Sequence, residues 1–191
     1  MSPRTPDQFH EIRETTKQKI VDAALELFAE AGFHTTSISQ IASKAGISKG
    51  LMYNYFESKE ELLKEIVFEG IEYITQSFDP NHDGILTKEE LLLFIDESFE
   101  QIKIHRNYWK LYFSIMMQAP IMTLFGEELM SKLGSYFLMI SAYFQEQKYE
   151  DPVAEMRFFS AMLDGIAMNY VMDPEEFPLD AIKQRIIKMY S

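Results

Sequence analysis

A set of oxygen-bearing side chains with the spacing of metal ligands lies between residues 79 and 90. Oxygen donors recur there at alternate positions, Gly84 permits a sharp turn, and Leu86 supplies an apolar anchor. Calcium binds about six to eight oxygens with flexible geometry. The segment therefore predicts a calcium site. Its ligands would be side-chain oxygens, with a backbone carbonyl at Ile85, from Asp79, Asn81, Asp83, Ile85, Thr87 and Glu90.

With the apolar helical patterns on both sides, this segment resembles the loop of EF-hand proteins, and calcium would be its cofactor. A simpler interpretation stays open. Thr87 and Glu90 also have the spacing of a capping box for a helix beginning at Lys88. Asp, Asn, Pro and Gly form turns between helices without any metal. EF-hand loops usually occur in pairs, and the sequence contains no second one.

A second segment whose side chains could bind a ligand is residues 49–56, which combines basic, amide and aromatic side chains. Met52 and Phe56 are four residues apart and can face a core, which leaves the other side chains at the surface. Such a surface suits contacts with phosphates and with base edges in a DNA groove. For Tyr53 the alternative is partial packing in the core. The surface side chains are Lys49, Tyr53, Asn54 and Tyr55.

The elements that must position these side chains are helices, because apolar residues recur with helical spacing almost throughout. The first is predicted at 16–31, the second at 38–44 with Ser37 and Gln40 as a capping box, and the third at 49–56. Two short helices joined by a three-residue turn containing Gly46 are typical of a helix-turn-helix. An ordinary helical hairpin in a bundle has the same spacing.

Four stretches of this region resemble the TetR family of bacterial repressors in residues and spacing. They are IVDAALELFAEAGF at 20–33, TSISQIA at 36–42, AGISKG at 45–50 and YNYFESKEEL at 53–62. Beyond Leu62 the resemblance is only of length and helical character. It implies an all-α fold, with an N-terminal three-helix helix-turn-helix domain followed by a helical bundle for ligand binding and dimerisation. It also implies a transcriptional regulator, a repressor, that binds a palindromic double-stranded DNA operator as a homodimer and is released by a small-molecule effector.

The same resemblance implies roles for individual residues. Lys59 would hold a phosphate. Leu51 stands where a small polar residue is common, so contact with a thymine methyl group fits there. Ser39 stands where a basic residue is frequent, which removes one phosphate contact. The predicted DNA-binding residues are Ser37, Ser39, Lys49, Gly50, Leu51, Tyr53, Asn54, Tyr55 and Lys59.

The predicted domains are a flexible arm at 1–14, the helix-turn-helix domain at 15–60 and an effector-binding and dimerisation domain at 61–191. In the last domain the helix beginning near residue 59 runs to 78, and further helices are predicted at 88–104, 106–118, 121–131, 133–147, 152–172 and 179–190.

The middle helices are rich in Met and aromatic residues, which suits an adaptable pocket for a small apolar or amphipathic effector. An ordinary hydrophobic core is the alternative. The predicted pocket residues are Phe94, Trp109, Tyr112, Phe113, Met116, Met117, Met122, Phe125, Tyr136 and Phe137.

The last two helices form the dimer interface according to the family resemblance. Small residues on the first of them would allow a close approach of helices, and a monomer that buries both stripes internally is the alternative. The predicted interface residues are Phe158, Ala161, Met162, Gly165, Ile166, Asn169, Leu179, Ile182 and Ile186.

Charge is distributed unevenly along the chain. Residues 1–60 carry 7 Lys/Arg and 8 Asp/Glu, a net charge of −1, whereas residues 61–191 carry 11 and 22, a net charge of −11. The overall charge of −12 therefore does not exclude DNA binding by the N-terminal segment. An acidic remainder can keep DNA away from surfaces that are not meant to contact it.

The composition also restricts the function classes. The absence of Cys excludes disulfides, zinc–thiolate sites and Cys nucleophiles. The four His are scattered, and neither a nucleophile elbow nor a Gly-rich phosphate loop is found, so an enzyme is not expected. A polar N-terminus and the lack of a long apolar stretch predict a cytoplasmic protein without a membrane partner. The competing function is a calcium-responsive helical interaction protein that does not bind DNA, which would leave the N-terminal motif unexplained.

Overall fold

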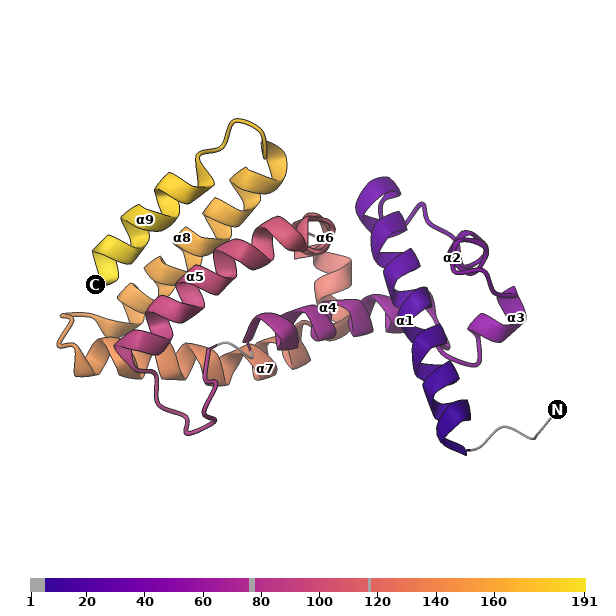
Figure 1. Cartoon of the computed structure of the whole chain (residues 1–191), viewed down its shortest axis with the longest axis horizontal. Coiled ribbons are helices and arrows are strands. Elements are labelled where there is room, and N and C mark those ends of the chain that lie inside the picture. The colour runs from indigo at the N-terminus through magenta and orange to yellow at the C-terminus, as the bar shows by residue number, and fades with distance from the viewer. Residues whose placement is uncertain (1–5, 76–77, 117) are drawn as a thin grey trace. The chain divides into compact units, whose positions relative to one another are not determined.

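A computed structural model describes residues 6–75, 78–116 and 118–191 (Figure 1). Every regular element within these ranges is a helix, so the predicted all-α fold is confirmed. The chain divides into two compact units, residues 1–68 and 69–191. The division falls later than the predicted boundary at residue 60, because the first half of the helix that spans it is buried, with Leu62 and Leu63 at 0% exposure and Ile66 at 2%.

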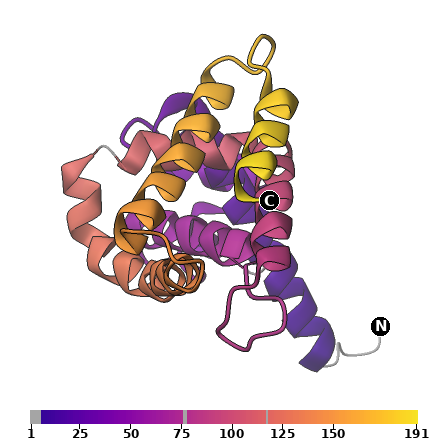
Figure 2. The same cartoon turned by 90° about the vertical axis from the view of Figure 1, so that its left-hand side faces the viewer.

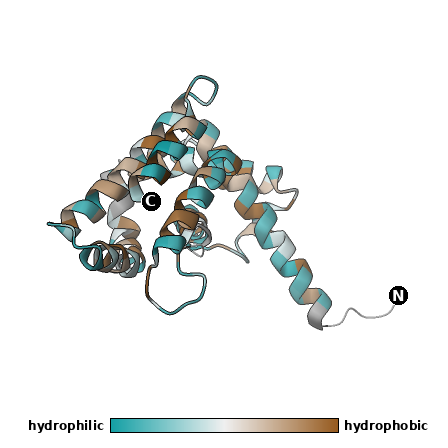
Figure 3. Ribbon diagram, turned by 60° about the vertical axis from the view of Figure 1, so that its left-hand side comes forward, coloured by the Kyte–Doolittle hydropathy of each residue, from teal (hydrophilic) through white to brown (hydrophobic). Residues whose placement is uncertain are grey.

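The first unit contains α1 (Pro6–Ala31), α2 (Ile38–Lys44), α3 (Lys49–Met52) and the beginning of α4 (Lys59–Thr75). The predicted flexible arm is wrong from residue 6 onward, because α1 already begins there. Proline is favoured in the first turn of a helix, and no Gly or Pro interrupts the following residues. Hydrophilic residues predominate along this part of α1 (Figure 3), which explains why no apolar stripe revealed it.

Helix α3 is shorter than predicted. It ends at Met52, and the chain continues through 53–56 in tight turns, with the amide of Asn54 bonded to the carbonyl of Leu51. The amide of Phe56 still reaches the Met52 carbonyl at 3.1 Å. Met52 and Phe56 are 0% and 3% exposed, so the predicted core-facing pair is confirmed.

The second unit contains the end of α4 and five further helices: α5 (Lys88–Ile104), α6 (Arg106–Met116), α7 (Ala119–Glu146), α8 (Pro152–Met172) and α9 (Leu179–Tyr190). Helix α7 is continuous, so the predicted break near residue 132 is wrong. Gly134 lies inside α7 with open space where a Cβ would be, and one glycine lowers helix stability without ending the helix. The loop that precedes α5 extends away from the helices (Figures 1 and 2).

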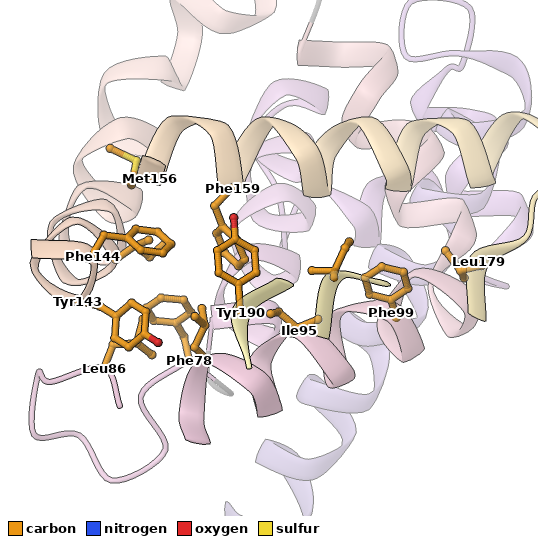
Figure 4. Packing of buried hydrophobic residues seen from close by; sticks show 13 residues of the cluster. Phe78, Leu86, Ile95, Phe99, Tyr143, Phe144, Met156, Phe159, Leu179 and Tyr190 are labelled. Carbon is orange, nitrogen blue, oxygen red and sulfur yellow. The ribbon is translucent and has the colours of Figure 1, made fainter. Parts of the chain in front are cut away.

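The core of the second unit combines aromatic side chains with Leu and Ile in about equal numbers (Figure 4). Helix α7 packs on α8, and α5 packs on α9. Phe159 from α8 meets Tyr190 from α9 edge to face, with ring centres 5.3 Å apart. Figure 4 shows Phe144 beside this pair, and the Phe144 and Phe159 ring centres are 6.2 Å apart. These contacts hold the helices that surround the cavity described below.

One buried cation also joins two of these helices. Lys183 of α9 is 8% exposed, and its Nζ lies 2.6 Å from Asp96 and 3.2 Å from Glu100, both on α5. Burial opposes protonation of Lys183, but the two carboxylates outweigh it and raise its pKa. No helix in the described part of the chain is both long enough and apolar enough to span a bilayer.

Candidate functional site

The beginning of α3 and the turn after it form an exposed surface on the first unit. Lys49, Gly50 and Asn54 are exposed, and Leu51 and Tyr53 are 39% and 47% exposed. Tyr53 is therefore not a core residue, which removes that alternative. Ser48 caps α3 by accepting a bond from the Leu51 amide at 3.1 Å, and the N-terminal end of α3 is exposed.

The two serines of the preceding helix are also accessible. Ser37 and Gln40 form the predicted capping box, with the Ser37 amide donating to Gln40 Oε1 at 2.8 Å. Ser39 is exposed and bonds to no residue in the described ranges. The residues predicted to bind DNA on α2 and α3 therefore lie in the same compact unit, and the packing of α2 on α1 and α3 holds these helices together.

Arg13 contributes to this surface and was missed by the sequence analysis. Its guanidinium lies 5.1 Å from the centre of the half-buried Tyr55 ring and donates to the Asn54 carbonyl at 3.4 Å. Because residues 6–14 are helical rather than a flexible arm, α1 holds Arg13 beside the turn after α3. Arg13 could have been recognised as a residue of this surface only if the first helix had been predicted to begin before it.

Lys59 has a structural role in the first unit. Its Nζ donates to the carbonyls of Phe33, Thr36 and His34 at 2.7, 2.9 and 3.4 Å, and it lies 4.4 Å from the centre of the Phe33 ring. An ammonium group has three donors, and all three are used here. The phosphate contact of Lys59 stays a prediction, beside this structural role.

Other lysines of the first unit are paired as well. Lys17 contacts Glu65 and Lys44 contacts Glu26. Within the described ranges, Lys49 makes no ion pair. Lys49 and Arg13 are therefore the cations of this surface that can approach a phosphate.

The second unit encloses a cavity of about 170 Å³. Five of the predicted pocket residues line it: Phe94, Trp109, Tyr112, Tyr136 and Phe137. The prediction is wrong for three others, because Phe125 is buried elsewhere, Met116 lies outside the lining, and Phe113 stacks behind Trp109 at 5.8 Å. Met117 and the side chain of Met122 lie outside the described part of the structure.

The shape of the cavity depends on a close approach between two helices. A Cβ on Gly70 of α4 would lie 1.9 Å from Cε2 of Tyr108 on α6, so only glycine fits there. Tyr108 is 6% exposed and lines the cavity, and burial strongly raises the pKa of its hydroxyl.

Polar groups in the cavity lining were also missed. Ser98 is 8% exposed, and its Oγ and the Nε1 of Trp109 are buried without a hydrogen-bond partner in the described structure. Asp164 lines the cavity, stays open to solvent on one side, and has its pKa raised by burial on the other. A signal existed for Asp164, because it is the only charged residue between Arg157 and Asp173.

Helix α8 presents an exposed apolar face. Phe158 is 52% exposed, Ala161 and Asn169 are exposed, and Met162, Gly165 and Ile166 are half-buried. Met168 and Met172, at 44% and 77% exposure, extend this face and were missed. On α9 the prediction is wrong for Leu179 and Ile186, which are 4% and 3% exposed within one chain, and Ile182 packs on the same core.

The side-chain oxygens of the loop at 79–90 accept hydrogen bonds from other groups of the same loop. Glu90 Oε2 accepts bonds from the amide and hydroxyl of Thr87, both at 2.8 Å, so the predicted capping box is confirmed. Asp79 accepts from the amides of Asp83 and Gly84, and Asp83 accepts from Ile85. Asn81 donates to the Asp83 carboxylate at 3.0 Å. No three His, Cys, Asp or Glu side chains converge as a metal-binding group among the described residues. Calcium binding stays a prediction.

Comparison with known proteins agrees with the helix-turn-helix geometry of the first unit. Residues 20–66 match the family described as "Bacterial regulatory proteins, tetR family". The first unit is a TetR-type helix-turn-helix domain. Its match to the fatty acid metabolism regulator protein of Bacillus subtilis is 35% identical over 82 residues, spanning 42% of each chain. IcaR, a negative transcriptional regulator of the biofilm operon in Staphylococcus epidermidis, is 28% identical over 138 residues, 71% of this chain and 70% of IcaR.

The likeness of fold extends beyond the TetR-type domain. The crystal structure of the regulator FadR from Bacillus subtilis, in complex with stearoyl-CoA, superposes with a TM-score of 0.74 at 22% identity, over 91% of this chain and 96% of FadR. The α-helical fold of this chain, the second unit included, is therefore shared with that structure. Both of the curated relatives described above carry names of regulators.

Proposed function

We propose that this protein is a transcriptional regulator of TetR type that binds a palindromic operator as a homodimer, acts as a repressor, and is released by a small-molecule effector. The observation that carries the proposal is the exposure of Lys49, Leu51, Tyr53 and Asn54 on a domain of TetR type. Exposed apolar and aromatic side chains beside a free cation have no role in the fold of the domain. They suit the major groove, where a side chain can meet base edges and a thymine methyl group.

The dimer is supported by the apolar face of α8. A homodimer with two-fold symmetry places the same face of both copies in contact, and the half-buried Gly165 would let the helices approach closely. The effector is supported by the cavity, whose lining is aromatic with a few polar groups, as in sites for small apolar molecules.

The test is selection of fragments from the source genome by the purified full chain, followed by nuclease footprinting of the enriched fragments. We expect a two-fold symmetric footprint with two protected half-sites about one helical turn apart. Enrichment of no fragment at low salt would contradict the proposal.

A separate proposal concerns calcium. The loop at 79–90 would bind it through Asp79, Asn81 and Asp83, with Glu90 exchanging the Thr87 groups for the ion. Calorimetric titration of the full chain with calcium, beside an Asp79→Asn variant, tests this. Heat that the substitution abolishes would support the site, and the same heat from both proteins would contradict it.

A further inference from the structure

The cavity of the second unit has one charged group among the described residues that line it. Asp164 is acidic, and no Lys, Arg or His is present there. Asp164 and Tyr112 both line the cavity, and burial first and the charge of Asp164 second raise the pKa of the Tyr112 hydroxyl to about 12. Among the described residues the lining therefore carries one negative charge and no cation, while the guanidinium of Arg157 lies 5.8 Å from the centre of the Phe137 ring, which also lines the cavity.

Aromatic rings surround the same region. The ring centres of Tyr112 and Trp109 are 5.6 Å apart at an interplanar angle of 79°, and Tyr108 stacks on Tyr112 at 6.2 Å. The faces of such rings carry negative charge and attract organic cations, most strongly where water is excluded. A carboxylate beside a cluster of aromatic rings is a favourable environment for a positive nitrogen that carries apolar groups.

Two polar groups of residues that line the cavity have no hydrogen-bond partner in the described structure. They are the Oγ of Ser98 and the Nε1 of Trp109, and both atoms are buried. Buried polar groups are ordinarily satisfied, and leaving one unpaired costs about 1–3 kcal/mol. A ligand that carries an acceptor such as an ester oxygen would satisfy the indole N–H.

We propose that the cavity binds an organic cation, with an apolar body and an acceptor against Ser98 and Trp109 and a protonated or quaternary nitrogen beside Asp164. This inference rests on the proposed function and names the chemical class of its effector. It differs from a ligand such as stearoyl-CoA in the similar FadR structure. The phosphates of an acyl-CoA require cations, and none is present in the described lining.

The protein offers its own reporter for this proposal, because Trp109 is the single Trp of the chain and lines the cavity. The fluorescence of the full chain is titrated with octanoylcholine, with its uncharged analogue carrying a tert-butyl group in place of trimethylammonium, and with octanoate. The variant is Asp164→Asn. The matched control is Glu127→Gln, which removes the same charge at an exposed position of α7 outside the lining.

We expect saturable binding of octanoylcholine, at least about tenfold tighter than that of the uncharged analogue or of octanoate. Asp164→Asn should remove this preference and leave binding of the uncharged analogue unchanged, whereas Glu127→Gln should keep the preference. Equal affinity for the charged and uncharged esters, tighter binding of octanoate, or no response to octanoylcholine would each overturn the proposal. No DNA is present in this titration, so its result is independent of whether the protein binds an operator.

Discussion

The ammonium group of Lys59 lies 4.4 Å from the centre of the Phe33 ring and donates to the carbonyl of the same residue at 2.7 Å. Lys59 begins α4, and Phe33 follows the end of α1 at Gly32, whose φ of 90° requires glycine. The Lys59 side chain thus joins the beginning of α4 to the segment that follows α1. These contacts give Lys59 a structural role in the domain, beside the phosphate contact that the family resemblance implied.

Lys59→Met should therefore destabilise the protein. It leaves three carbonyl groups without their charged donor, and a hydrogen bond to a charged group contributes about 1.5–3 kcal/mol. We expect thermal unfolding of the domain to shift down by at least about 5 °C. Lys49→Met is the matched control and should leave the melting temperature unchanged. An unchanged melting temperature for Lys59→Met would contradict the structural role.

Two glycines of the second unit should respond oppositely to the same substitution. Gly70→Ala places a Cβ 1.9 Å from the Tyr108 ring and should destabilise by about 1–3 kcal/mol through overpacking. Gly134→Ala meets open space inside α7 and should stabilise by up to about 1 kcal/mol. Urea unfolding of both variants measures the difference. If Gly70→Ala left the stability unchanged or raised it, the close packing of Gly70 on Tyr108 would be wrong.

The contrast between Phe94 and Asp164 shows what the sequence could predict. Caps, helix ends and most helices follow from local patterns, so Ser37, Gly32 and the bounds of α5 were predictable. Half of the predicted pocket residues line the cavity, because large aromatic residues on the middle helices are enriched near it. Asp164 and Ser98 were not found, since a polar residue becomes a pocket residue only through the packing of other helices around it.

The predictions for Arg13 and Leu179 were wrong for related reasons. A polar helix such as the start of α1 carries no apolar stripe, so Arg13 was placed in an arm. An apolar stripe on α9 does not specify whether it packs within its own chain or against another copy. In the structure α9 packs on α5, so Leu179 and Ile186 are buried within their own chain.

The ion pairs between α5 and α9 predict a dependence of stability on pH. Lys183 first and Lys103 second lower the pKa of Glu100 below its ordinary value of 4.5. A lowered pKa in the folded state stabilises the protein above that value, and the stabilisation is lost as the pH falls through and below it. Glu100→Gln should therefore reduce stability at neutral pH, by about 0.5 kcal/mol because Glu100 is partly exposed, and by less near pH 3.

Urea unfolding at the two pH values checks this prediction. Glu97→Gln, which removes a charge on α5 without an ion pair in the described structure, is the control and should show no such difference. A Glu100→Gln effect of equal size at both pH values would contradict the role of the ion pair.

The apolar face of α8 predicts the oligomeric state. Phe158→Glu adds a charge at its 52% exposed position and should convert a dimer into a monomer, because two carboxylates would meet near the symmetry axis. Leu138→Glu, at 74% exposure on α7, is the control and should remain dimeric. Light scattering during gel filtration gives both masses. A Phe158→Glu protein that stays dimeric would place the interface elsewhere.

The most direct test of DNA reading by α3 is the salt dependence of binding to the selected operator fragment, measured by fluorescence anisotropy. For Lys49→Ala we expect weaker binding and a slope of log K against log salt reduced by about one per subunit, with the melting temperature unchanged. For Asn54→Ala we expect a loss of preference for the operator over a scrambled fragment at an unchanged salt slope. Wild-type affinity and wild-type preference in both variants would show that this surface does not contact DNA.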